Sequence, residues 1–162
     1  MSPNSQIVAT PVTPAAAQAA TAYAPSQEEA ELLQLSNEWM DVALKLKDEL
    51  QLREIMAPEF TLQIWDAARA PQSLDMWLNT TLHRLEKIMF TYAGLNARVF
   101  GDAAIAFSRF SWSGFLDGQP FTDRGFIADF WERRVGRWQV VSRRSAPLQQ
   151  IRELTETPLP PT

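Results

Sequence analysis

The chain lacks cysteine altogether and has a single histidine, His83, among its 162 residues. The absence of cysteine excludes disulfides, thiolate metal ligands and cysteine nucleophiles. One imidazole is too few for a zinc site built mainly from histidines, and the carboxylates show no metal-ligand spacing. We therefore expect no metal and no cofactor, and we place His83 at the surface, opposite the apolar stripe of its predicted helix.

Long apolar runs and an excess of positive charge are missing as well. No segment approaches the ~20 consecutive apolar residues that a membrane span needs, so no membrane partner is expected. The net charge is −4, and the five arginines between positions 133 and 144 alternate across two faces and a turn. This pattern argues against nucleic acid as a partner. Residues 1–26 contain no Lys or Arg and so lack the charged start of a secretory signal, which predicts a cytoplasmic protein.

The two ends of the chain differ in composition from its middle. Residues 1–26 carry no charged side chain and are rich in Ala, Pro, Thr and Ser, so they are predicted to form a disordered tail. Residues 149–162 include the stretch TPLPPT and are predicted to be a flexible C-terminal tail. The remaining residues, 27–148, are long enough for one ordinary hydrophobic core and are predicted to form one domain.

The first half of this domain has helical periodicity. Ser26-x-x-Glu29 is a capping box that predicts a helix over 27–47. A short second helix over about 48–56 and a third over about 73–89 follow from apolar stripes at helical spacing. Each helix therefore has one face suited to packing against a sheet.

The second half has the alternation of β-strands. The segment FTLQIWD, residues 60–66, alternates between apolar and polar side chains and is predicted to be the first strand. From Phe90 onward, apolar segments are separated by dipeptides that fit two-residue hairpin turns, namely Gly101-Asp102, Asp117-Gly118 and Val135-Gly136. Helices followed by an antiparallel meander predict an α+β domain, in which three helices pack on one face of a strongly curved antiparallel sheet.

A carboxylate, Asp129, falls in phase with the core residues of the strand before the last hairpin. If Val135 and Gly136 form the turn, Asp129 lies opposite Ser142 and diagonal to Arg144. Two interpretations stay open. Asp129 is an acid or base tuned by an apolar pocket, or it is half of a buried ion pair with Arg144 that fixes the strand register.

These strand pairings predict a pocket between the helices and the sheet, occupied by a small apolar ligand. The candidate catalytic residues are Asp129, Arg144 and, at the end of the first strand, Asp66. The candidate ligand-binding residues are aromatic or hydroxyl side chains expected on the same surface: Trp39, Ser108, Phe110, Trp112, Trp131 and Ser142. The aromatic spacing also fits plain core packing.

The opposite face of the predicted sheet is apolar too. Its alternate residues are Ile105, Phe107, Phe126, Ala128, Phe130 and Val141. Because the helices can cover only one face, a second copy of the chain is expected to cover the other. This arrangement predicts a homodimer through the convex face of the sheet.

Three stretches carry a resemblance to a known family: the first helix with Trp39, the turn and strand GDAAIAF, and the last hairpin DFWERRVGRWQVV. Over residues 28–147 the chain resembles SnoaL-like and DUF4440-like members of the NTF2-like superfamily. The resemblance implies a cone of three helices over a bent sheet, often dimeric through the convex face, with an aspartate pointing into the cone at Asp129. Ketosteroid isomerases of this family use a Tyr on the first helix and an Asp near the end of the first strand, where this chain has Trp39 and Asp66.

The resemblance leaves the function open, because the family includes isomerases, dehydratases, cyclases and members without an established reaction. One hypothesis is a cofactor-free acid/base enzyme that acts on a small apolar carbonyl or hydroxyl compound, with Asp129 as the proton shuttle. The alternative is a non-catalytic ligand-binding or dimeric assembly module.

Overall fold

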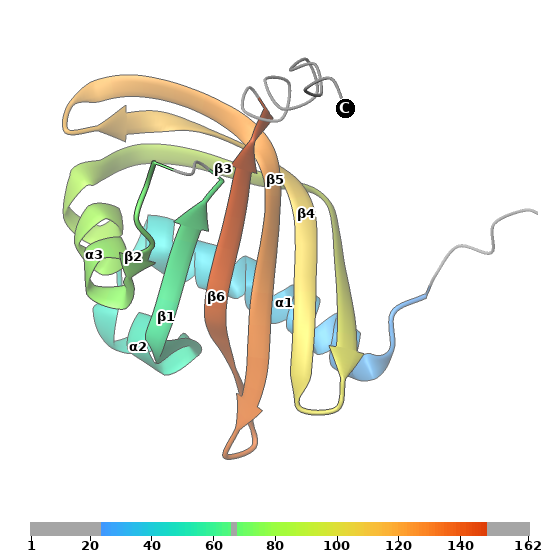
Figure 1. Cartoon of the computed structure of the whole chain (residues 1–162). Coiled ribbons are helices and arrows are strands. Elements are labelled where there is room, and N and C mark those ends of the chain that lie inside the picture. Colours follow the sequence, from blue (N-terminus) through green and yellow to red (C-terminus); the bar gives the residue numbers. More distant parts are fainter. Residues whose placement is uncertain (1–23, 66–67, 149–162) are drawn as a thin grey trace, which may run out of the picture.

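The computed structural model describes residues 24–65 and 68–148, and it forms helices packed on one face of a curved six-stranded sheet (Figure 1). This confirms the predicted α+β class. The predictions for Asp66, for 149–162 and for all but the last three residues of 1–26 lie outside the described ranges. Within those ranges, no helix is both long and apolar enough to cross a membrane.

The first helix begins where its capping box predicts. In α1, Gln27–Asp41, the Ser26 Oγ accepts the Glu29 N–H at 3.1 Å, and the Glu29 carboxylate accepts the Ser26 N–H at 2.9 Å. The helix continues as a π-helical turn over Val42–Leu46. Its buried stripe includes Leu32 and Trp39, which face the sheet.

The third helix ends earlier than predicted. After α2, Glu49–Ile55, comes α3, Leu74–Asn79, which continues as a π-helical turn over Thr80–Arg84 and then becomes strand instead of reaching residue 89. The Lys47 ammonium donates to the carbonyls of Thr81, Leu82 and Leu85 at 3.2, 3.2 and 2.5 Å. A cation that satisfies the last carbonyls of a helix stabilises its end, and this contact was not visible in the local pattern.

The sheet has the strand order β2-β1-β6-β5-β4-β3. The strands are β1 Met56–Ile64, β2 Gln72–Ser73, β3 Leu85–Phe100, β4 Ala103–Leu116, β5 Gln119–Arg134 and β6 Arg137–Pro147. The three predicted hairpin turns are all present. One detail differs from the prediction: β1 pairs in parallel with β6, so the sheet is mixed and not wholly antiparallel.

The two faces of the sheet have different surroundings. The inner face packs against the helices, and its core is centred on Trp39, whose ring lies 5.9 Å from both Phe60 and Trp131 and 5.6 Å from Trp77. In Figure 1, α1 crosses behind the sheet, while the outer face is turned to the viewer with no described helix in front of it. The deep end of the cone is thus filled by aromatic rings.

The register of the last hairpin differs from the predicted one by a single residue. Trp131 pairs with Val140 as expected, but Val141 is an extra residue in a β-bulge, so Ser142 pairs with Phe130 and Arg143 pairs with Asp129. The prediction that Asp129 faces Ser142 with Arg144 on its diagonal is therefore wrong. The neighbouring strand β1 is irregular between Met56 and Thr61, at the same level of the sheet. Both strands bend there, because a bulge kinks a strand and increases its twist.

The β5–β6 turn generates the first prediction. Val135 has φ 50° and its side chain is fully exposed, although a β-branched residue is strained in this left-handed region. Val135→Asn should raise the free energy of unfolding by about 1 kcal/mol, measured by urea denaturation. Val135→Thr is the matched control, since it adds polarity but keeps the branching, and it should change stability little. If both substitutions changed the free energy of unfolding equally, backbone strain at Val135 would be contradicted.

Candidate functional site

A buried ion pair lies on the inner face of the sheet, between adjacent positions on β5 and β6. Arg143 donates from Nε to Asp129 Oδ1 at 2.7 Å and from Nη2 to Asp129 Oδ2 at 2.9 Å. The side chains of Asp129 and Arg143 are only 1% and 7% exposed. Both carboxylate oxygens are thus engaged in a bidentate contact, a strong and directional form of ion pair.

The guanidinium of Arg143 contacts two further elements of the fold, β3 and α1. Its Nη2 donates to the Tyr92 hydroxyl at 3.0 Å, its Nη1 lies 3.4 Å from the Met40 sulfur, and its Cζ lies 4.2 Å from the centre of the Trp39 ring. An arginine has five N–H donors, of which four have partners here, one of them the weakly accepting sulfur. The remaining Nη1 hydrogen has no partner among the described residues.

This environment perturbs two ionisation equilibria. Burial acts to lower the pKa of Arg143, but the Asp129 carboxylate and the Tyr92 hydroxyl offset it, and the pKa of the guanidinium lies above its usual value. Burial raises the pKa of the Tyr92 phenol to about 12; the Arg143 charge lowers this pKa by a smaller amount, and the Asp129 charge raises it. Arg143 is therefore a permanent cation, and Tyr92 is a neutral phenol at neutral pH.

Beside this ion pair is a cavity of about 130 Å³, which we call the cone cavity. It lies between the helices and the inner face of the sheet. Among its lining residues are four aromatic side chains and two charged ones: Trp77, Phe90, Phe110, Trp112, Asp123 and Arg143. Its volume is below the roughly 300–1,000 Å³ that is usual for small-molecule sites.

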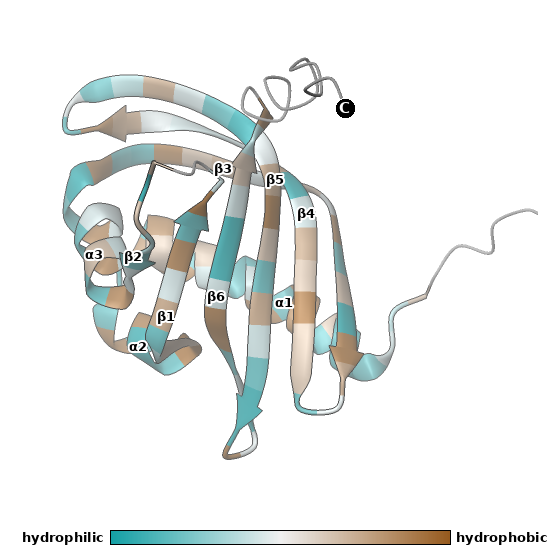
Figure 2. Cartoon of the chain, viewed as in Figure 1, coloured by the Kyte–Doolittle hydropathy of each residue, from teal (hydrophilic) through white to brown (hydrophobic). Residues whose placement is uncertain are grey.

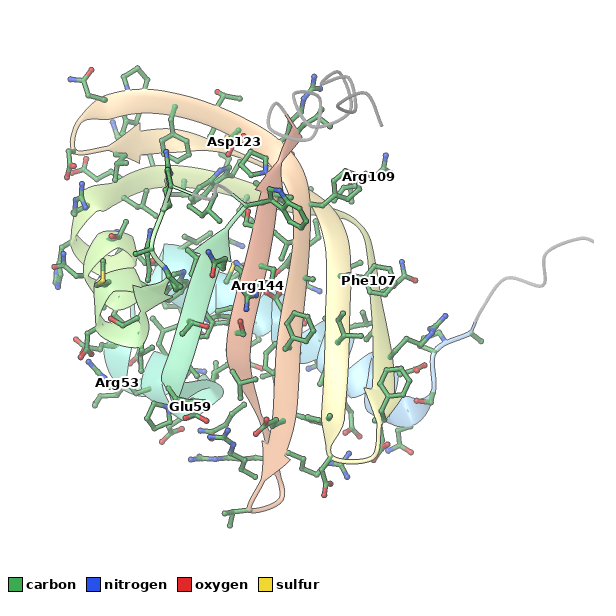
Figure 3. The ribbon with its side chains drawn as sticks, in the orientation of Figure 1. Arg53, Glu59, Phe107, Arg109, Asp123 and Arg144 are labelled. Carbon is green, nitrogen blue, oxygen red and sulfur yellow. The ribbon has the colours of Figure 1, made fainter. Side chains whose placement is uncertain are left out.

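A larger hollow, of about 930 Å³, crosses the outer face of the sheet, and we call it the outer groove. It receives residues from five strands, β1, β6, β5, β4 and β3, among them Phe107, Arg109, Phe126, Ala128 and Arg144, and also Trp65, which follows β1. Figure 3 shows Phe107 and Arg144 on this face, with Arg109 above them. In Figure 2 the lower part of β4, where residues 103–107 are all apolar, is coloured from beige to brown. The outer face is therefore hydrophobic and hollowed at once.

The structure separates the candidate catalytic residues. Asp129 is buried with Arg143, whereas Arg144 is exposed on the outer face, where its Nη1 donates to the Gln63 side chain at 2.9 Å. Ser142 also leaves the predicted surface, and its hydroxyl lies 3.3 Å from that of Thr61. Asp66 lies outside the described residues.

The candidate ligand-binding residues fall into three groups. Phe110 and Trp112 line the cone cavity, as the sequence predicted. Trp39 and Trp131 are fully buried in the core and do not border that cavity. Ser108 lines the outer groove, and its hydroxyl donates to the Arg109 carbonyl at 2.6 Å.

Three residues of the inner face were not among the sequence candidates. Asp123 is in phase with Asp129 along β5, so the same alternation, extended by six residues, would have found it. Arg143 could be identified only by placing the bulge, which has no signature in this sequence. Tyr92 reaches Arg143 from β3, across a distance in the chain that no local pattern covers.

His83 is exposed, as predicted. Across the described ranges, no three acidic or histidine side chains gather in a group that could hold a metal ion.

Comparison with known proteins gives a clear result for the fold alone. No protein-family model and no curated protein matches the sequence. A putative Ca/calmodulin-dependent kinase II association domain from Exiguobacterium sibiricum aligns with a TM-score of 0.67 at 12% identity, covering 78% of this chain and 97% of that one. An NTF2-like protein from Cytophaga hutchinsonii aligns with a TM-score of 0.67 at 10% identity, covering 76% of this chain and 100% of that one.

A third similar structure, the CaMKII hub of S. rosetta, has a TM-score of 0.61 at 19% identity and covers 76% of this chain and 99% of that one. The chain therefore has the NTF2-like fold, in agreement with the resemblance seen in its sequence. The finer assignment to the SnoaL-like or DUF4440-like group stays a prediction.

The ion pair predicts opposite outcomes for two neighbouring arginines. Arg143→Met should lower the free energy of unfolding by about 3–5 kcal/mol, because it leaves the Asp129 charge buried without a partner. Arg144→Met, on the outer face, should change it by less than about 0.5 kcal/mol. The double variant Asp129→Leu/Arg143→Met should be less destabilised than the sum of its single variants. Urea denaturation measures the free energy of unfolding of the double variant and of Arg143→Met, Arg144→Met and Asp129→Leu. A larger loss of stability for Arg144→Met than for Arg143→Met would refute the register.

The phenol of Tyr92 offers a test by titration. In a Tyr23→Phe variant, Tyr92 is the one remaining tyrosine, and ultraviolet absorbance after a rapid pH jump should give a midpoint near 12 for the folded protein. The unfolded chain should titrate near the usual value of about 10. Since the unfolded state loses this proton first, the contribution of Tyr92 to stability should fall as pH rises from about 10 toward 12. A folded midpoint near 10 would be inconsistent with a buried phenol.

Proposed function

We propose that the protein is a self-associating NTF2-like module, in which the outer face of the sheet packs against the same face of a second copy. The observation that carries this proposal is the outer groove. On adjacent strands, Phe107, Phe126 and Phe130 are 42%, 47% and 40% exposed, although they belong to a regular sheet that helices cover on its other side. A contiguous apolar surface of this kind is costly in water and usually marks an interaction site.

The arrangement of these residues suits a two-fold symmetric contact, in which the same surface of two copies meets. Ile105 pairs with Phe130, Phe107 with Ala128, and Arg109 with Phe126, so the apolar side chains of β4 and β5 form a compact patch with an arginine at its edge. A two-fold axis through such a patch brings the same apolar residues together and leaves the charged ones at the rim. A closed dimer also protects the patch from open-ended association.

Two comparisons support the proposal at the level of the fold. Solved structures with this fold include proteins named as an association domain and as a hub of CaMKII. Fold similarity at this identity is an analogy and transfers no particular assembly to this chain. The main argument is the exposure of the phenylalanines in this protein, and the fold similarity adds to it.

Acid/base catalysis by Asp129, the first hypothesis from the sequence, has less support from the geometry. Both oxygens of Asp129 are bonded to Arg143, and Asp129 does not border the cone cavity. The catalytic roles of Asp129, Arg144 and Asp66 stay predictions, as does the cytoplasmic location. A small ligand in the cone cavity is a second candidate function, favoured by the aromatic lining of that cavity and by the Nη1 hydrogen of Arg143 that has no partner among the described residues.

Sedimentation equilibrium tests the proposed self-association. The wild-type chain should have about twice its 18.3 kDa mass, and Phe126→Lys should shift it to the monomer by placing a charge inside the apolar patch. The matched control is Leu50→Lys on α2, which introduces the same charge at a side chain that is 81% exposed and outside the groove. A wild-type monomer at all concentrations, or a dimer that survives Phe126→Lys, would contradict the proposal.

A further inference from the structure

The charges around the cone cavity do not cancel. Arg143 is matched by Asp129 in a bidentate contact, so this pair contributes no net charge. The other charged group in the lining is Asp123. Its Oδ1 accepts the backbone N–H of Arg124 at 2.8 Å, and no cation among the described residues contacts its carboxylate. The described lining therefore carries one uncompensated negative charge.

Asp123 is directed to the cavity by the regular pairing of β4 and β5. These two strands pair without a register shift, and Asp123 lies opposite Trp112, which itself lies opposite Phe90 on β3. The three residues form one row across the inner face, at the end of the sheet that bends over the helices. Figure 3 shows Asp123 at this bent end, well away from Phe107 and from Arg144 on the outer face.

The aromatic side chains favour a positively charged occupant as well. Phe90, Phe110, Trp77 and Trp112 all line the cavity, and the Phe90 ring lies 6.2 Å from Phe110 and 6.5 Å from Trp112. The face of an aromatic ring is electronegative and attracts an organic cation within about 6 Å of its centre. A carboxylate beside several such faces is the usual combination for binding an ammonium group.

Two buried donors in the lining residues require an acceptor. The Trp112 Nε1 hydrogen has no hydrogen-bond partner, and one Nη1 hydrogen of Arg143 is also without one among the described residues. A hydroxyl or ether oxygen on the ligand would satisfy one of them. A carboxylate would gain less than usual from Arg143, because Asp129 already neutralises that guanidinium, and it would be repelled by Asp123.

We infer that the cone cavity binds a small organic ammonium ion that carries a hydroxyl group, with Asp123 as the counter-ion and the four aromatic rings around the cationic head. The inference rests on the second candidate function, ligand binding in the cone, and is independent of self-association through the outer face. It names Asp123, and not Asp129, as the acid that meets the ligand.

Three probes of nearly the same shape test the charge selectivity: choline, its neutral isostere 3,3-dimethylbutan-1-ol, and the anion 3,3-dimethylbutanoate. Isothermal titration calorimetry on the full chain should show choline binding about tenfold more tightly than the alcohol, and no binding of the anion. Asp123→Asn should abolish the difference between choline and the alcohol. The control is Asp102→Asn, the same chemical change at an exposed turn, which should leave choline binding intact.

The alternative outcomes are distinct. Equal or tighter binding of the alcohol or the anion, or choline binding that survives Asp123→Asn, overturns the assignment of Asp123 while ligand binding in the cone still stands. The absence of binding by all three probes up to millimolar concentrations overturns both the inference and the second candidate function. Thermal unfolding of Asp123→Asn without ligand, compared with wild type, establishes that the variant is folded.

Discussion

The bidentate ion pair between Asp129 and Arg143 is the contact on which the inner face of the sheet depends. Once buried, each charge requires the other, because an unpaired charge in the core costs several kcal/mol. The pair fixes the register of β5 against β6, and the guanidinium then reaches Trp39 and Met40 on α1 and Tyr92 on β3. One interaction thus connects four elements that are far apart in the chain. It explains how an acid can occupy a core position on β5.

The sequence predicted the fold well because its local signals agree with one another. The capping box at Ser26, the apolar stripe through Trp39 and the turn dipeptides each have one good structural solution. The partner of Asp129 could not be predicted for a physical reason. Val140 and Val141 are both apolar, and both faces of the sheet are apolar, so alternation cannot tell which valine points inward and which is the bulge. An error of one residue exchanges Arg143 for Arg144 and therefore moves the candidate site from one face to the other.

The cone is filled at Trp39 and Trp131, two of the predicted ligand-binding residues, and stays open at two others, Phe110 and Trp112. Trp39, Trp131 and Phe60 occupy the deep end, so the cavity that remains lies farther along the inner face, toward Asp123. The larger hollow is on the outer face. Ile127 and Ser145 border both hollows, so the two are separated by the thickness of a single sheet. Self-association and ligand binding would therefore use opposite sides of the same strands and need not compete for surface.

Lys47 has an influence that extends beyond the end of the third helix. By satisfying the carbonyls of Thr81, Leu82 and Leu85, it fixes the point at which the chain stops coiling and starts extending. The residues released from the helix lengthen β3, which pairs with β4 as far as Leu116 and carries Phe90 beside Trp112. Lys47, which follows the first helix, thus influences the opening of the cone through Thr81 and Leu85, two residues that line the cone cavity, although it lines neither hollow itself. In a related chain, a change at this position would be expected to reshape the cavity without altering any residue that lines it.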